Sequence, residues 1–141
     1  MGYPFPSEPW LLALQVVLNA DEQYARTARN WEGDILCVVE AQAGPDWMAA
    51  FYLDLWHGAC RQAKACSPGA DGLPPAKFVL RASLPNFYKV IAGELDPMQA
   101  MMTRRLRVEG NMGYMLRNVP TVLDFVRCCR LVEIEPKLVF A

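Results

Sequence analysis

The sequence is poor in the residues on which enzymes and nucleic-acid-binding proteins most often depend. Its 141 residues include one histidine, His57, and its formal net charge is −1. A histidine followed at once by Gly58 is typical of a turn, so we interpret it as structural and not catalytic. The near-neutral charge argues against the large basic surface that nucleic acid requires. The composition therefore predicts no nucleic-acid partner.

Motifs that bind metals, phosphates or acyl groups are also missing. There is no glycine-rich phosphate loop, no Gly-x-Ser-x-Gly elbow and no His-Glu-x-x-His sequence. Cys60 and Cys66 are six residues apart, and Cys128 and Cys129 are adjacent. No cysteine pair therefore has the Cys-x-x-Cys spacing of a metal or redox site. We expect no metal site and no cofactor.

Acidic residues need separate consideration, because paired carboxylates can act as general acid and base. Asp54 lies inside an apolar segment, and Glu94 and Asp96 flank an expected helix start. We interpret Asp54 as solvent-facing or paired with an arginine, and the other two as helix-capping residues. A small enzyme that uses Asp54 or Glu94 is the weaker alternative. The favoured interpretation is a protein that is not an enzyme.

The sequence also lacks long apolar runs and a basic leader. The stretch from Trp10 to Leu18 is about half of the ~20 residues needed to span a bilayer. The segment from Met1 to Pro9 contains Glu8 and no lysine or arginine, unlike a secretory signal. An odd number of cysteines, five, fits a reducing compartment. We therefore expect a cytoplasmic protein.

What the sequence does have is apolar area, because 53% of its residues are hydrophobic. With this length, the composition predicts one ordered domain. Three prolines indicate an extended arm at residues 1–9, followed by a single domain at 10–141. Apolar spacing predicts helices that begin near residues 8, 21, 87, 97, 112 and 120, and strands near 34–40, 47–56, 59–65, 77–83 and 105–109.

The order of these elements predicts the fold class. Strands joined by short turns, with helices in separate blocks, favour an α+β fold: a five-stranded, mostly antiparallel sheet with helices packed on one face. Four phenylalanines are expected to face the layer between sheet and helices: Phe51, Phe78, Phe87 and Phe125. Ligand sites are mostly apolar, and such a layer is a suitable place for one.

Methionine is concentrated in one region. Four of the seven methionines are Met98, Met101, Met102 and Met112, and Met115 follows closely. Their unbranched side chains adapt to irregular apolar shapes and suit promiscuous hydrophobic binding surfaces. An ordinary hydrophobic core is the alternative interpretation.

The same region carries a resemblance to a known family. The segment from Gly93 to Met102 (GELDPMQAMM), followed by Arg105 to Met112 (RLRVEGNM), resembles the sterol carrier protein family of lipid-binding domains. That family has an acidic-proline helix start, a short apolar helix and a basic-apolar strand that ends in a glycine-polar-methionine step. Upstream, the segments Gly33 to Ile35, Tyr52 to Leu55 and Ala76 to Ser83 fall where the family has strands.

The resemblance implies a sheet and helices that enclose an apolar tunnel for sterols, fatty acyl chains or other lipids, which the protein binds or transfers without catalysis. Combined with the apolar faces above, it predicts as ligand-contacting residues Phe51, Leu53, Phe78, Leu80, Phe87, Ile91, Met98, Met101, Met102, Leu106, Val108, Met112, Met115, Leu116 and Phe125. The sequence departs from the family in having Arg105 and Arg107 where lysine is common, and in Pro120, which splits the last helical region.

Two further expectations concern partners. An accessory or interaction module that works beside an enzyme, or as a homodimer, is the alternative function, with Tyr3, Phe5 and Trp10 of the arm as its contact. The arginines at 104, 105 and 107 are expected to form a solvated face. Their transient contact with an anionic lipid head group or membrane surface is the sharper alternative.

Overall fold

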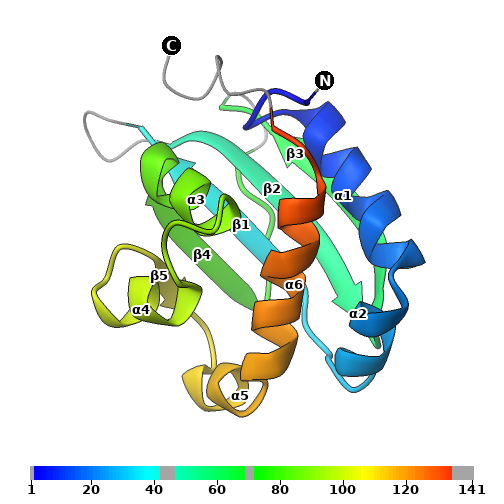
Figure 1. Cartoon of the computed structure of the whole chain (residues 1–141). Helices are drawn as coiled ribbons and strands as arrows, with labels where there is room; N and C mark the ends of the chain where they lie inside the picture. Colours follow the sequence, from blue (N-terminus) through cyan, green and yellow to red (C-terminus); the bar gives the residue numbers. More distant parts are fainter. Residues whose placement is uncertain (1, 42–46, 69–71, 135–141) are drawn as a thin grey trace.

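The computed structural model describes residues 2–41, 47–68 and 72–134. Within these ranges, helices and strands follow one another in the predicted order (Figure 1). They are α1 (Glu8–Ala20), α2 (Glu22–Thr27), β1 (Ile35–Glu40), β2 (Trp47–Trp56), β3 (Ala59–Cys66), β4 (Phe78–Ser83), α3 (Leu84–Ile91), α4 (Pro97–Met102), β5 (Arg107–Glu109), α5 (Met112–Arg117) and α6 (Val119–Leu131).

The strands form one five-stranded sheet in the order β3-β2-β1-β4-β5. Only the central pair, β1 with β4, is parallel, and the other neighbouring pairs in this sheet are antiparallel. Helices α1, α6 and α3 lie side by side across one face of the sheet, with α6 between the other two (Figure 1). The prediction of a mostly antiparallel sheet covered on one face is confirmed.

Side-chain caps begin several of the helices. Ser7 Oγ accepts a hydrogen bond from the backbone N–H of Trp10 at 3.2 Å, and Asp96 accepts one from Gln99 at 3.1 Å. Such caps satisfy backbone donors that have no partner within the helix. The capping role predicted for Asp96 is confirmed. That for Glu94 is wrong, since its exposed side chain caps no helix in the described part of the chain.

The other predicted structural roles also hold. His57 lies in the turn between β2 and β3, and its Nε2 is 2.7 Å from Glu32 Oε2. Asp54 pairs with Arg61 across the neighbouring strands, with 3.1 Å between Oδ2 and Nε. Both pairs lie on the protein surface.

The N-terminal arm is shorter than predicted, because Ser7 already caps α1. The backbone N–H of Tyr3 donates to the carbonyl of Glu133 at 2.8 Å, and Tyr3 forms a parallel bridge with Ile134. The two ends of the described chain therefore lie side by side (Figure 1). Phe5 is buried beneath this contact, so the arm is part of the core.

Helices α2 and α6 are joined by a charged cluster. Arg127 Nη2 donates to Asp21 Oδ1 at 2.6 Å, and Arg127 Nε donates to the buried Asp124 at 2.7 Å. Gln23 also donates to Asp124 at 2.8 Å. The hydrogen bond from Arg127 holds the pKa of Asp21 below its ordinary value. The charge of Asp21 therefore stabilises the fold above the ordinary pKa of 3.8, and this contribution disappears as the pH falls through the folded-state pKa.

The substitution Asp21→Asn tests this pair. Asparagine still caps α2, so the change removes the charge and little else. At neutral pH we expect the free energy of unfolding to fall by up to about 1 kcal/mol, and the deficit to shrink between neutral pH and about pH 2, as the pH falls below 3.8 and toward the lowered folded-state pKa of Asp21. Urea denaturation at both pH values measures it. Asp96→Asn is the control, since Asp96 caps α4 without an ion-pair partner in the described chain. A deficit independent of pH would contradict the explanation.

Candidate ligand-binding site

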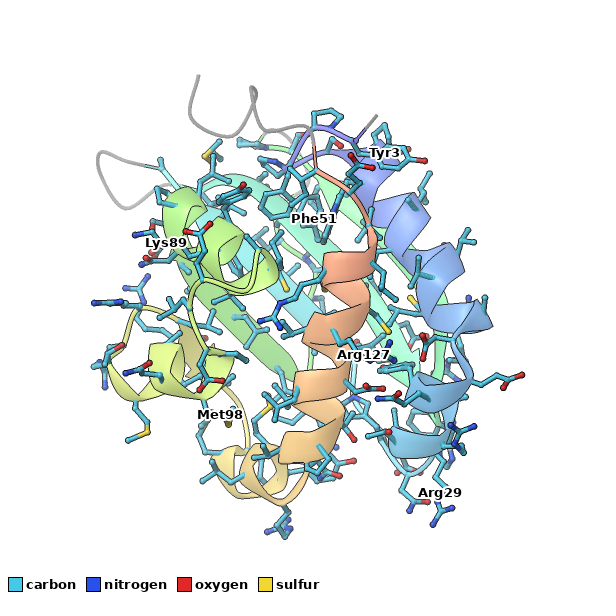
Figure 2. All side chains as sticks on the ribbon, in the orientation of Figure 1. Tyr3, Arg29, Phe51, Lys89, Met98 and Arg127 are labelled. Carbon is cyan, nitrogen blue, oxygen red and sulfur yellow. The ribbon has the colours of Figure 1, made fainter. Side chains whose placement is uncertain are left out.

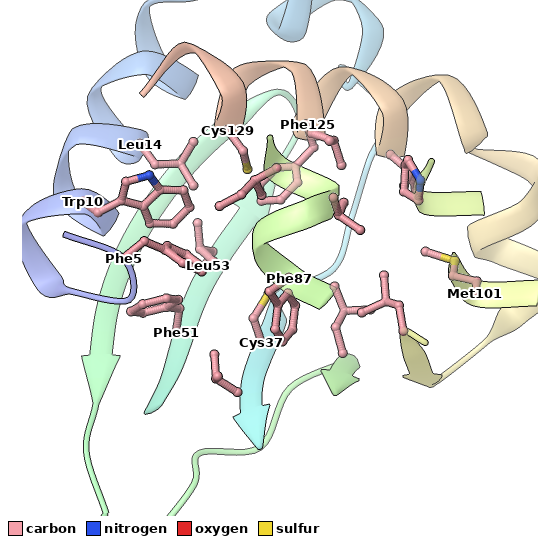
Figure 3. Close-up of a pocket in the computed structure, with 18 residues that line it drawn as sticks. Phe5, Trp10, Leu14, Cys37, Phe51, Leu53, Phe87, Met101, Phe125 and Cys129 are labelled. Carbon is pink, nitrogen blue, oxygen red and sulfur yellow. The ribbon is translucent and has the colours of Figure 1, made fainter. Parts of the chain in front are cut away.

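An apolar cavity of about 80 Å³, which we call the central cavity, lies between the sheet and the helices (Figure 3). Every lining residue has an apolar side chain or a thiol. They are Phe5, Trp10, Leu14, Cys37, Val39, Phe51, Leu53, Leu80, Phe87, Val90, Ile91, Pro97, Met101, Leu106, Val122, Phe125, Val126 and Cys129.

The floor of the central cavity is a row of side chains that crosses the sheet. Register places Cys37 of β1 between Phe51 of β2 and Leu80 of β4. Because strand residues two apart share a face, Val39 lies on the same side as Cys37. The small thiol between two large side chains leaves a depression in the middle of the sheet.

The roof of the cavity comes mainly from α6. Val122, Phe125, Val126 and Cys129 recur at spacings of three and four residues, which places them on one helix face. The proline at position 120 occupies the first turn of α6, where it has no hydrogen bond to lose. It therefore starts the helix without disturbing this face.

The arm and α1 close one end of the cavity. The rings of Phe5 and Trp10 meet edge to face, with centroids 4.8 Å apart, and both rings lie 5.9 Å from that of Phe51 (Figure 3). Phe5 is 4% and Trp10 3% exposed. The three rings form an aromatic plug at the end of the cavity that is nearest the chain termini.

Two further cavities share walls with the central one. The first, which we call the arginine cavity, measures about 200 Å³ and is lined by Met101, Arg104, Leu106, Arg107, Val108 and Met112. The second, the tyrosine cavity, measures about 40 Å³ and is lined by Tyr24, Trp31, Ile35, Leu55, Leu80, Met101, Met115, Thr121, Val122 and Phe125. Met101 lines all three, so one flexible side chain stands where they meet.

The structure brings most of the sequence-predicted residues to these cavities. The central cavity is lined by Phe51, Leu53, Leu80, Phe87, Ile91, Met101, Leu106 and Phe125. Val108 and Met112 line the arginine cavity, and Met115 lines the tyrosine cavity. Phe78, Met98, Met102 and Leu116 line none of the three.

Met102 and Leu116, which were predicted to contact the ligand, lie on the short helices α4 and α5. Met102 is 84% and Leu116 59% exposed. Helix α4 turns Pro97 and Ala100 inward, and successive residues differ by about 100° in direction, so Met102 points to solvent while Met101 points inward. Met98 is half-buried on the same helix and lies apart from Phe51 in the view of Figure 2.

Phe78 is buried beyond the end of the central cavity. Its ring centroid is 5.4 Å from that of Trp31 and 5.9 Å from that of Tyr114. A Cβ at Gly33 would lie 3.0 Å from the Phe78 ring, and one at Gly110 would lie 2.7 Å from it. Two glycines therefore make room for a filled core at the position where a ligand contact was predicted.

Several lining residues were not predicted as ligand contacts. Val122, Val126 and Cys129 share the α6 face that contains Phe125, and that periodicity was sufficient to identify them. No comparable sequence pattern predicts that Phe5 and Trp10 line the cavity, because the packing position of a proline-rich arm cannot be inferred from its sequence.

Burial changes the chemistry of the two thiols in the cavity wall. It raises the pKa of Cys37 to about 12 and that of Cys129 well above its ordinary value. Both thiols therefore stay protonated near neutral pH and are weak nucleophiles. The described residues also include no group of three His, Cys, Asp or Glu side chains that could hold a metal ion.

We expect Cys37 and Cys129 to resist a thiol-specific reagent in the folded protein. At pH 8, a thiol whose pKa is raised to about 12 carries far less thiolate than an ordinary cysteine, so we expect Cys37 to react much more slowly. Mass spectrometry after timed labelling would locate each modified cysteine, with protein in urea as the fully reactive control. Rapid native labelling of either thiol would show that solvent enters the cavity.

These features define a class: an α+β fold in which a five-stranded sheet and the helices on one of its faces surround an apolar cavity. A family model for the SCP-2 sterol transfer family matches residues 14–122. The chain therefore belongs to this family, whose domains bind and transfer lipids. No curated protein matches the chain. None of the described helices combines the length and hydrophobicity needed to cross a bilayer.

Solved structures agree with this family. A crystal structure of sterol carrier protein 2 aligns with a TM-score of 0.80 and 33% identity, covering 89% of this chain and 97% of that chain. The solution structure of a conserved hypothetical protein from Thermus thermophilus, described as possibly a sterol carrier protein, aligns with a TM-score of 0.81 and 33% identity, covering 97% and 95%. Apo sterol carrier protein 2 from Yarrowia lipolytica shares the fold at a TM-score of 0.58 and 18% identity, covering 89% and 93%.

Proposed function

We propose that this chain binds a lipid-like ligand in the central cavity and carries out no chemistry on it. The observation that supports this most directly is a cavity in the core whose lining residues are almost entirely apolar, with two thiols. Such a wall offers water few hydrogen-bond partners and therefore favours an apolar guest. Membership of a lipid-binding family points the same way.

The energetic cost of the cavity also favours a binding role. Unfilled volume costs about 24 cal/mol per Å³, so 80 Å³ corresponds to about 2 kcal/mol of folding free energy. A larger residue in place of Cys37 would fill the depression between Phe51 and Leu80. The protein instead retains a void at the centre of its core, and an apolar ligand would recover the lost contacts.

A ligand needs more room than the central cavity offers in this conformation. Sites for drug-sized molecules usually occupy about 300–1,000 Å³, well above the present 80 Å³. Met101 lines the central cavity and both neighbouring ones, and its unbranched side chain changes rotamer easily. We infer that ligand entry rotates Met101 and joins the cavities into one longer channel.

The accessory-module alternative loses its expected contact. Phe5 and Trp10, which were predicted to meet a partner, are buried in the aromatic plug, and only Tyr3 of the three is exposed. The predicted homodimer, cytoplasmic location and transient membrane contact stay predictions.

Adjacent methionines provide a matched test of the site. Met101→Glu places a charge in the cavity wall and should weaken binding of a fluorescent fatty acid at least tenfold, whereas Met102→Glu should leave the affinity unchanged. Thermal denaturation checks that both variants fold. Equal effects of the two changes on affinity would place the ligand elsewhere.

Filling the cavity provides an independent test. Val122→Phe adds apolar volume inside it, and Leu123→Phe adds the same ring type on the exposed side of α6. The first should reduce lipid binding severalfold without loss of thermal stability, since it fills space; the second should change neither. Mass spectrometry of natively extracted protein would show any co-purifying lipid. Unchanged binding by Val122→Phe, or no lipid bound by any measure, would contradict the proposal.

A further inference from the structure

Two short helices at one end of the molecule expose large apolar side chains. Met102 of α4 is 84% exposed, and Leu116 and Met112 of α5 are 59% and 37% exposed. Residues four apart share a helix face, so Met112 and Leu116 point to the same side of α5. Met102 and Leu116 line none of the three cavities, so ligand binding does not account for them.

These side chains belong to one surface, which we call the α4–α5 tip. Arg104, in the turn after α4, and Met112, the first residue of α5, line the same depression, the arginine cavity. Helices α4 and α5 lie at the same end of the molecule, away from the N-terminal arm (Figure 1). The exposed residues that define the tip are Met102, Arg104, Arg105, Met112, Leu116 and Arg117.

The tip carries a local positive charge. Its exposed arginines, Arg104, Arg105 and Arg117, form no ion pair with any residue in the ranges 2–41, 47–68 and 72–134. The carboxylates of the neighbouring strands β1 and β5 are already paired with other arginines. Glu94 and Asp96 precede α4, at the end of that helix opposite Arg104. The whole chain has a formal net charge of −1, so the positive charge is a property of the tip and not of the protein.

Helix α1 also exposes an apolar stripe, but without cations. Leu12 is 43% and Val16 68% exposed, and they share a face because they are four residues apart. No residue of α1 is a lysine or an arginine, and Glu8 begins the helix. Exposed apolar side chains and unpaired arginines therefore coincide at the α4–α5 tip and do not coincide on α1.

We propose that the α4–α5 tip docks the protein onto an anionic lipid bilayer. Met102 and Leu116 enter the layer of head groups and upper acyl chains, where they leave water, and the three arginines lie against the lipid phosphates. Each basic residue near an anionic surface adds attraction, which falls off within a Debye length. The inference goes beyond the proposed function, because it assigns a docking surface and its partner whichever ligand the cavities hold.

A bilayer fits the tip better than a partner protein does. Stable protein interfaces bury about 800 Å² on each partner, whereas the tip offers three apolar side chains on two helices of six residues each. Guanidinium groups match phosphates with paired hydrogen bonds, and a bilayer presents phosphates all along its surface. Separate apolar side chains can each insert between lipids without a matching pocket.

Co-sedimentation with lipid vesicles measures this docking on the full chain. The wild-type protein should bind vesicles made of equal parts phosphatidylcholine and phosphatidylglycerol. It should bind pure phosphatidylcholine vesicles at least about tenfold more weakly, because the attraction of three arginines is lost there. Higher salt should reduce the preference for the anionic vesicles, because the tip is open to solvent.

Matched glutamate substitutions separate the tip from the rest of the surface. Met102→Glu and Val16→Glu each place one negative charge at a strongly exposed apolar position, the first on the tip and the second on α1. Met102→Glu should weaken binding to the anionic vesicles at least about tenfold and leave the affinity for a fluorescent fatty acid unchanged. Val16→Glu should change neither.

A third variant removes charge from the tip without loss of stability. The backbone of Arg104 has a φ of 61°, a left-handed position that favours glycine. Arg104→Gly should therefore maintain or raise the melting temperature while it weakens binding to the anionic vesicles about fivefold. That combination would not arise if Arg104 acted only in folding.

The outcomes separate the docking surface from the cavity ligand. Equal binding of the wild type to both kinds of vesicle, or no binding to the anionic ones, overturns the docking surface. Equal losses in Met102→Glu and Val16→Glu would indicate a general charge effect, and unchanged vesicle binding in Met102→Glu would place the contact on another face; each also overturns it. Failure of the wild type to bind fatty acid while it binds anionic vesicles would overturn the cavity ligand and support the tip.

Discussion

The structure depends on one row of side chains across the sheet, in which residue size alternates. Along the five strands the row runs Ala65, Phe51, Cys37, Leu80 and Val108. Cys37 in this row and Cys129 of α6 both line the central cavity. Small thiols on the sheet and on the helix therefore leave space between the larger Phe51 and Leu80 unfilled. The cavity thus follows from strand register and side-chain size together.

Elements with a single clear apolar face were predictable from the sequence. Strand β2 alternates between the two sides, and the α6 face that contains Phe125 repeats every three to four residues, so their inward side chains could be identified. Helices α4 and α5 have six residues each, too few for periodicity to show which methionines face inward. The exposed Met102 illustrates this failure. The sequence shows that its side chain is apolar, but not whether that side chain points toward the sheet or toward solvent.

Contacts between segments that are distant in the chain could not be predicted from the sequence, for a different reason. The arm docks through Tyr3 and Glu133, which are separated by nearly the whole chain, and only then does Phe5 reach the cavity. Phe78 has the correct strand face, yet the aromatic side chains of Trp31 and Tyr114 fill the space above it. Local patterns report which side of an element is apolar. They do not report which segment covers it.

Two features that oppose stability occur beside each other in this protein. One is the void above Cys37, and the other is the left-handed backbone of Arg104, which lines the adjoining cavity. Either could be relieved by a single substitution, since a larger residue would fill the first and a glycine would relax the second. Met101 and Leu106 line both cavities, and the unbranched Met101 is the better able of the two to change rotamer. The void is the feature that the proposed apolar ligand would relieve, because such a ligand would restore the contacts that are missing above Cys37.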